Sequence, residues 1–214
     1  MGKKYISFAN EDEIINKIHE NKSYVEKLLL NKMSLQNIIN TAIGSNTYRI
    51  FKSNGLIKPS DLFRKWAFSQ LGKNDDVKTK LCVKTKEDFD LSIDFLCNNL
   101  TELWNKELTG MTIFRSRKML SLLLKNFCFW NEFNDEELKT YINRIPLPFD
   151  SKTLSAIRLP YNRVGRYKIP TAPTMAFVDD DDKYVELQKY VQSLADRAEV
   201  PVIYLDYLYF DFFD

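Results

Sequence analysis

Two long helices joined by a very short turn are the sequence feature that most constrains this fold. Residues 87–107 and 113–127 both place apolar side chains three or four positions apart, the spacing of one buried helix face. Only LTGMT separates them, with Gly110 as the expected turn residue. Helices connected so tightly lie antiparallel, so the sequence predicts a helical hairpin. The predicted buried stripes are Phe89, Ile93, Leu96, Leu100 and Leu103, then Phe114, Leu120, Leu123, Leu124 and Phe127.

The rest of the chain also has a mainly helical pattern. Residues 11–43 predict two or three short helices, and another is expected to begin with Ser60 or Asp61 as its N-cap. Acidic residues after Asn134 favour a further helix. The run 77–86 alternates weakly and predicts a short strand or an irregular segment. With six glycines and seven prolines in 214 residues, the predicted fold class is all-α.

Composition excludes several classes of protein. A hydrophobic content of 44% is too high for a disordered chain and allows one large domain or two small packed lobes. Cys82, Cys97 and Cys128 show no paired spacing, which argues against a disulfide framework or zinc site and favours a reducing, intracellular compartment. The single histidine, His19, lies in a polar helix, so histidine catalysis is not expected. No stretch approaches the roughly 20 apolar residues of a membrane span.

Positive charge is clustered, although the net charge is only +2. Between Asp150 and Asp179 there are five basic residues and no acid, with Tyr161 and Tyr167 interleaved. Such a segment can grip phosphates, or it can be a solvated basic loop, and the residues alone leave both open. The basic residues are Lys152, Arg158, Arg163, Arg166 and Lys168.

Lys118 is a candidate nucleophile. A lysine attacks only as the neutral amine, and burial or neighbouring cations lower the pKa of an amine. Arg115 and Arg117 stand beside Lys118, and Lys125 follows two turns later. The alternative is an ordinary lysine at the edge of a core helix, with its stem on apolar surface and its ammonium in water. Taken alone, the pattern favours that alternative.

Two carboxylates are candidate partners for such a lysine. Asp150 follows IPLPF and precedes SKTL, so its expected structural role is the N-cap of the next helix, where its carboxylate is rigidly aimed. Asp206 is the only charged residue in the apolar run 202–210. A buried, unpaired carboxylate is costly, so Asp206 is expected to have a structural partner or a ligand with N–H donors.

Together these residues resemble the helix-hairpin-helix DNA glycosylase/lyase superfamily, and more closely its archaeal-type 8-oxoguanine DNA glycosylase (AGOG) branch. The pair Lys118-Met119 looks like that branch's catalytic Lys-Met. The segment PLPFD at 146–150 is similar to its Pro-x-Pro-Val-Asp motif, and the 32-residue separation from Lys118 fits. The segment 200–210 resembles its Ile-Pro-Pro-Leu-His-Leu-Asp-Thr-Leu-Leu-Trp segment, which lines the base pocket.

The resemblance implies a chemistry for each matching residue. Lys118 would attack C1′ of a damaged nucleoside, with Asp150 activating the amine and stabilising the positive charge on the sugar. Asp206 would accept hydrogen bonds from a flipped guanine-type base, on which Phe210 would stack. The other base-binding positions are Lys125, Leu122, which stands where an aromatic is expected, and Trp66, while Ala42 stands where the branch has a glutamine.

The resemblance also implies an architecture and a partner. The fold would be two-lobed, with the active cleft between a terminal lobe of residues 1–58 plus 151–214 and a hairpin lobe of residues 59–150. The partner would be double-stranded DNA containing a damaged base, bound by a monomer in the cytoplasm or nucleoid without a cofactor, metal or membrane. The expected DNA contacts are Gly110, Arg115, Arg117, Arg158, Arg163 and Arg166. The alternatives are a glycosylase of this fold for another lesion, and a non-catalytic helical DNA-binding protein.

Overall fold

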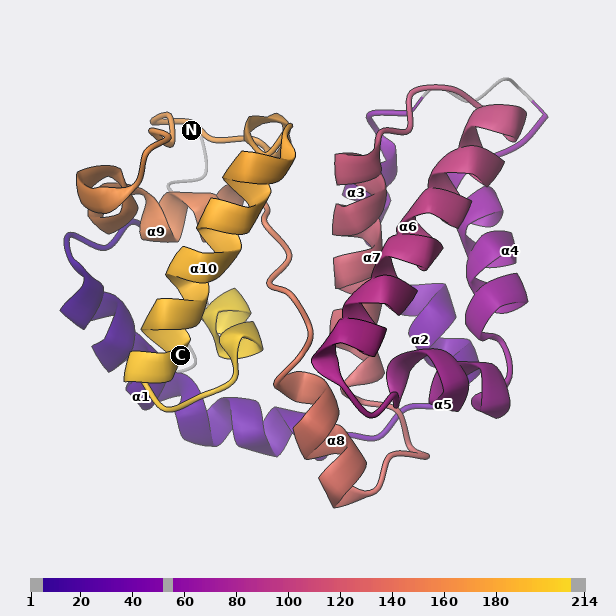
Figure 1. The fold of residues 1–214 in the computed structure, drawn as a ribbon, viewed down its shortest axis with the longest axis horizontal. Coiled ribbons are helices and arrows are strands. Elements are labelled where there is room, and N and C mark those ends of the chain that lie inside the picture. Colours follow the sequence, from indigo (N-terminus) through magenta and orange to yellow (C-terminus); the bar gives the residue numbers. More distant parts are fainter. Residues whose placement is uncertain (1–5, 52–55, 209–214) are drawn as a thin grey trace. The chain divides into compact units, whose positions relative to one another are not determined.

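The structure is a computed structural model that describes residues 6–51 and 56–208 (Figure 1). It is all-α, as predicted, and within the described ranges it contains no β-strand, only an isolated bridge between Met33 and Trp130. The helices are α1 (Glu11–Leu29), α2 (Leu35–Thr41), α3 (Ser45–Tyr48), α4 (Pro59–Leu71), α5 (Asn74–Leu81), α6 (Lys86–Glu107), α7 (Ile113–Phe127), α8 (Asp135–Ile142), α9 (Ser151–Val164) and α10 (Asp181–Arg197), with short 3₁₀ helices η1 (Met175–Phe177) and η2 (Val202–Tyr207).

The chain folds into two compact units. The terminal unit comprises the described residues up to Leu30 and from Ile145 onward, and the central unit is Asn31–Arg144. These bounds correct the predicted lobes, which assigned residues 31–58 to the terminal part. Helix α2 packs against α4 and α7, and α3 packs against α4, so this segment belongs to the central unit.

The helical hairpin is the core of the central unit. Helix α7 has the predicted bounds, and α6 and α7 run side by side (Figure 1). A hydrogen bond from Thr101 Oγ1 to Ser116 Oγ, 3.0 Å long, links the two helices. The predicted stripe of α6 is shifted slightly, because Cys97 and Trp104 are fully buried where Ile93 and Leu103 were expected.

Helix α5 corrects the prediction of a strand or irregular segment for residues 77–81, whereas residues 82–85 are irregular, as predicted. Val77 and Leu81 lie four residues apart and are both buried, which is the spacing of a helix face rather than a strand. Asp75 and Asp76 stand in the first turn, where the helix dipole favours acidic side chains. Helix α5 packs against α4 and α6.

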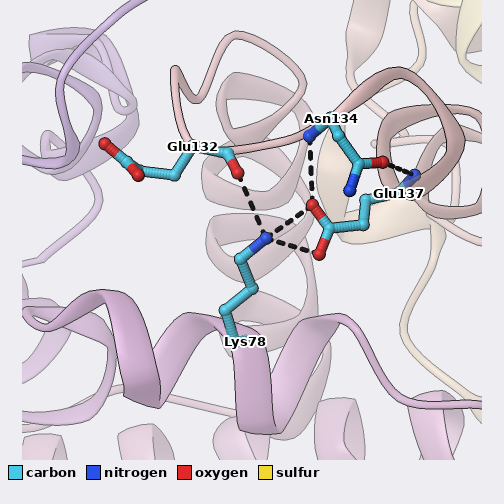
Figure 2. Close-up of polar contacts among 4 residues, drawn as sticks. All are labelled: Lys78, Glu132, Asn134 and Glu137. Carbon is cyan, nitrogen blue, oxygen red and sulfur yellow. Dashed lines mark hydrogen bonds and ion pairs between the residues drawn. The ribbon is translucent and has the colours of Figure 1, made fainter.

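A polar clamp ties α5 to the start of α8 (Figure 2). Lys78 Nζ lies 2.5 Å from both carboxylate oxygens of Glu137 and 3.1 Å from the carbonyl oxygen of Glu132. Glu137 also completes a capping box with Asn134. The hydrogen bond from Lys78 lowers the pKa of Glu137, and the hydrogen bond from the Asn134 backbone N–H lowers it further. The same ammonium lies 5.3 Å from the centre of the Trp130 ring, a cation–π distance.

The start of α4 also differs from its prediction. The helix begins at Pro59, and Lys58 occupies the N-cap position without a side-chain capping bond. Ser60 and Asp61 therefore lie inside the first turn. Proline suits the first helical position because its missing N–H would be unpaired there in any case.

The terminal unit packs α1, α10 and η2 against one another. Its interior holds the buried Asn21 of α1, whose amide nitrogen donates to the Tyr207 carbonyl at 3.0 Å. Arg197 of α10 pairs with Glu11 and Asp12 at the start of α1. None of the described helices combines the length and the apolar character that crossing a membrane requires.

Candidate functional site

The turn between α6 and α7 depends on Gly110. Its φ of 86° lies in the left-handed region, which side chains rarely adopt. Asn105 holds the turn from α6, because its amide donates to the Met111 carbonyl at 2.9 Å and accepts from the Met111 N–H at 3.2 Å. The Arg115 guanidinium donates to the Gly110 carbonyl. The predicted role of Gly110 as the turn residue is confirmed, and its contact with DNA stays a prediction.

The two arginines at the start of α7 both have contacts within the central unit. The Arg115 guanidinium lies 5.8 Å from the centre of the Phe51 ring in addition to its bond with Gly110. Arg117 pairs with Asp94 of α6, with Nη2 and Oδ1 3.5 Å apart. Both side chains therefore brace the hairpin, which is a role that sequence reasoning did not assign to them.

Lys118 stands on a helix whose residues are all buried or half-buried. No residue of α7 is exposed, and Lys118 itself is half-buried. Leu122 and Lys125 follow at intervals of four and three residues, so the three share one face of α7, and both are half-buried as well. The helix thus brings together three of the positions that the resemblance assigns to the active site.

Ala42 lies beside the C-terminal end of this face. The Asn126 amide donates to the Leu122 carbonyl at 2.8 Å and to the Ala42 carbonyl at 3.4 Å. Ala42 is itself buried. The position where the resembling branch has a glutamine therefore adjoins α7, but here it contributes a backbone carbonyl and no side-chain amide.

Trp66 does not belong to this group. The indole is fully buried between α4 and α6, and its N–H donates to Asn99 Oδ1 at 2.9 Å. A ring with no exposed surface and a satisfied N–H serves the core of the central unit. This corrects the prediction that Trp66 contacts a base.

Asp150 is the N-cap of α9, as predicted. Its Oδ1 accepts from the N–H groups of Lys152 and Thr153 at 2.8 and 2.9 Å and from the Thr153 hydroxyl at 3.3 Å. All three bonds end on the same oxygen, so Oδ2 takes no part in the cap. The carboxylate is half-buried and fixed in direction. Sequence reasoning missed Thr153, because its hydroxyl bond to Oδ1 depends on the geometry of the helix end.

Asp206 is buried, as the apolar run around it predicted. It lies on η2 with only 3% of its surface exposed, and its η2 neighbours from Val202 to Tyr207 are buried too. The element is a short 3₁₀ helix, which presents successive side chains on three sides. Phe210, the expected stacking residue, lies outside the described residues.

The basic segment after Asp150 divides into inward and outward groups. Arg158 is half-buried on α9, whereas Arg163 and Arg166 are exposed. Lys168 Nζ donates to the carbonyls of Asn162 and Gly165 at 2.8 Å each, so it caps the end of α9.

The outward arginines lie at the end of α9 and in the loop that follows it. The Asn162 amide bonds to the Ile169 carbonyl and N–H at 2.9 and 2.7 Å, which closes the loop after α9. Glu186 Oε1 accepts from the Arg166 N–H and the Tyr161 hydroxyl, both at 2.7 Å. Arg163 and Arg166 are therefore the segment's best candidates for phosphate contacts.

The thiols are unsuited to chemistry at neutral pH. Burial raises the pKa of Cys82 to about 11 and the pKa values of Cys97 and Cys128 to about 12. All three therefore stay protonated, and a thiol is a poor nucleophile and metal ligand. Within the described part of the chain, no group of three histidine, cysteine or acidic side chains is arranged to hold a metal ion.

Comparisons of the chain with protein-family profiles, with curated protein sequences and with solved structures find no match. A function for this protein has to be argued from its own residues.

Proposed function

We propose that the protein is a DNA glycosylase and lyase that removes 8-oxoguanine through a Schiff base on Lys118. The observation that carries the proposal is the environment of this lysine. It is half-buried on a helix without an exposed residue, and Arg115 and Arg117 precede it within one turn. Nucleophilic attack needs the neutral amine, and burial of a lysine disfavours its charged form.

The proposed reaction begins with base extrusion, because the sugar carbon C1′ is inaccessible inside a stacked duplex. The Lys118 nitrogen attacks C1′, and the C1′–N9 bond breaks with its electron pair leaving on the base, which takes up a proton. The substituted amine gives up one proton, which the departing base takes. The nitrogen lone pair then expels O4′, which takes up a proton from solvent as the sugar ring opens, and the product is the protonated Schiff base. Loss of a C2′ proton then expels the 3′ phosphate and cuts the strand by β-elimination.

Asp150 is suited to the charge that develops in this reaction. Positive charge accumulates on the sugar as the base leaves, and a fixed carboxylate stabilises it without reorganising. The α9 cap holds Asp150 through Oδ1, which leaves Oδ2 for this role.

Asp206 supports the choice of a guanine-type base. The N1–H and the exocyclic amine of guanine are two donors on one edge, and a carboxylate accepts both. Asp206 is such a carboxylate, and it is buried on η2 among apolar and aromatic neighbours.

Borohydride trapping on an 8-oxoguanine duplex tests the proposal. Borohydride reduces a Schiff base to a stable amine, so we expect the wild-type protein to become covalently attached to the DNA. The adduct should be absent in Lys118→Gln and retained in Lys78→Gln, a change at another half-buried lysine of the same unit. An undiminished adduct in Lys118→Gln would remove this lysine from the mechanism.

The same assay separates the two alternatives. A glycosylase for another lesion would form an adduct with a different member of a panel of modified duplexes. A non-catalytic protein would bind DNA with strong salt dependence through exposed residues such as Arg163 and Arg166 and would form no adduct.

A further inference from the structure

A cavity inside the central unit forms a second candidate site, with no proposed role in the reaction at Lys118. It lies where the end of α2, helix α3 and the start of α4 meet, and its volume is about 370 Å³. Sites for small molecules commonly enclose about 300–1,000 Å³. The lining residues that matter here are Arg49, Arg64, Tyr48, Ser60, Ile43 and Phe51.

The chain around this cavity is strongly basic. Residues 42–68 contain five lysines and arginines and one acid, Asp61, in a protein whose net charge is only +2. This local excess resembles that of the segment after Asp150, but here two of the cations line a cavity. Clustered positive charge on concave surface attracts anions.

The two arginines are available to a ligand. Within the described ranges, the exposed Arg49 guanidinium makes no hydrogen bond or ion pair. Arg64 pairs with Asp61 at 3.2 Å, but 39% of the arginine side chain and 60% of the aspartate side chain are exposed. Exposed pairs of this kind contribute only about 0–1 kcal/mol, so an anionic ligand can displace Asp61.

Two further features favour a phosphate in this position. Burial raises the pKa of the Tyr48 hydroxyl well above its usual value, against a smaller lowering by Arg64, so the hydroxyl stays a donor at neutral pH. The N-terminus of α4 has no side-chain cap, and Ser60 of its first turn lines the cavity. The positive end of a helix of this length adds to the attraction for an anion.

One wall of the cavity is apolar. Ile43 and Phe51 are both buried against the core, and Phe51 packs on Trp104 with ring centres 4.5 Å apart. A small inorganic anion would leave this wall uncovered. A ligand that joins a phosphate to an apolar or aromatic body would use both the wall and the arginines.

We propose that this cavity binds a phosphate ester the size of a nucleotide, with Arg49 and Arg64 holding the phosphate and Ile43 and Phe51 contacting the body of the ligand. The phosphate could belong to a free nucleotide or to a DNA strand. The site goes beyond the proposed reaction and does not depend on it.

Calorimetric titration of the full chain with adenosine monophosphate tests this proposal. We expect saturable binding that is tighter than binding of inorganic phosphate or of adenosine, since each of these fills only half of the site. Arg49→Gln and Arg64→Gln should each weaken binding about tenfold or more, because each removes a charge-assisted hydrogen bond. Asp61→Asn should tighten binding by up to about fivefold, because it frees Arg64.

Lys65→Gln is the matched control. It removes one charge from the same exposed stretch of α4, but Lys65 does not line the cavity. We expect less than about a twofold effect from it, the size of a change in diffuse charge alone. Far-UV circular dichroism of each variant checks that it remains folded.

Three results would overturn the inference: no saturable binding of adenosine monophosphate, equal weakening in Arg49→Gln and Lys65→Gln, or weaker binding in Asp61→Asn. Competition with a single-stranded oligonucleotide identifies the source of the phosphate. Displacement of the mononucleotide indicates a strand phosphate, and its absence indicates a free nucleotide. Because the readout is equilibrium binding, a failed trapping experiment at Lys118 would leave this result unchanged.

Discussion

Lys78 and Lys118 are both half-buried lysines of the central unit, but their surroundings differ. The Lys78 ammonium is held by both oxygens of Glu137, the Glu132 carbonyl and the faces of two aromatic rings, all of which stabilise its charged form (Figure 2). Lys118 instead follows Arg115 and Arg117 on a helix whose residues are all buried or half-buried. Partial burial of a lysine therefore does not define its role. The contacts of the ammonium decide its role, and at Lys78 they are those of a structural cation.

The largest effect should come from the acid paired with Lys118 in the proposed reaction. Asp150→Asn should slow base release about 100-fold or more, because it removes a fixed charge that stabilises the transition state. Stability should change little, since asparagine caps helices as well as aspartate does. Single-turnover kinetics on an 8-oxoguanine duplex, with thermal denaturation, measures both effects.

Asp180→Asn is the control for that change. Asp180 caps α10 by accepting from the Lys183 N–H at 2.8 Å, which is the structural role that Asp150 has at α9. This variant should retain the wild-type rate. Equal losses of activity in the two variants would show that Asp150 matters only as a helix cap.

The next largest effect should come from the turn that begins the helix of Lys118. Gly110→Ala forces a side chain into the left-handed region and should lower the free energy of unfolding by about 1–2 kcal/mol. Gly44→Ala should change it by less than about 0.5 kcal/mol, because a Cβ at Gly44 meets no atom within 4 Å. Urea denaturation compares the two. A similar loss in both variants would contradict the account of the turn.

A smaller effect is expected at the Lys78 clamp. A double-mutant cycle with Lys78→Gln and Glu137→Gln should give a coupling energy of about 1 kcal/mol, because the side chains are only about one-third exposed. Denaturant titration of the four proteins measures it. A coupling energy indistinguishable from zero would mean that the contact between Lys78 and Glu137 does not stabilise the fold.

The smallest effect is the pH dependence of the same clamp. The pKa of Glu137 is lower in the folded protein than in the unfolded chain, so its stabilising contribution is present above the unfolded pKa of roughly 4.3 and is lost as pH falls through the folded pKa. The stability difference between wild type and Glu137→Gln should therefore shrink below about pH 4. Repeating the denaturant titration across pH 3–6 would show it, and a constant difference would exclude this carboxylate as the source.

Local patterns predicted much of the fold. The bounds of α7 follow from helical spacing, the helix after Asn134 from its acidic first turn, and the cap at Asp150 from a side chain that bonds to nearby N–H groups. Each of these signals lies within a few residues of the structure that it determines. Sequence reasoning performs best where the physics is local.

Its failures involve distant contacts. The weak alternation in 77–86 suggested a strand, although Val77 and Leu81 have the spacing of a buried helix face. The Lys78 clamp joins two residues that are 59 positions apart in the chain. Trp66 matched a pocket residue by alignment, but its burial depends on the packing of α6 against α4. A one-dimensional pattern does not show which face of a helix another helix will cover.

The residues of the candidate site could be named from the sequence, but their contacts could not. Sequence patterns indicated Lys118, Asp150 and the buried position of Asp206. They did not indicate that Thr153 shares Oδ1 of Asp150 with the cap, because that contact depends on the geometry of the helix end. The cavity beside Arg49 was also missed, although the basic character of residues 42–68 is visible in the sequence.

The position of the covalent bond tests the central claim most directly. The borohydride-reduced adduct with an 8-oxoguanine duplex can be digested, and the modified lysine located by peptide mass spectrometry. The proposed chemistry predicts that the sugar remnant lies on Lys118, with Lys78 and Lys125 unmodified. A remnant on any other lysine, or no adduct at all, would contradict the assignment of Lys118 as the nucleophile.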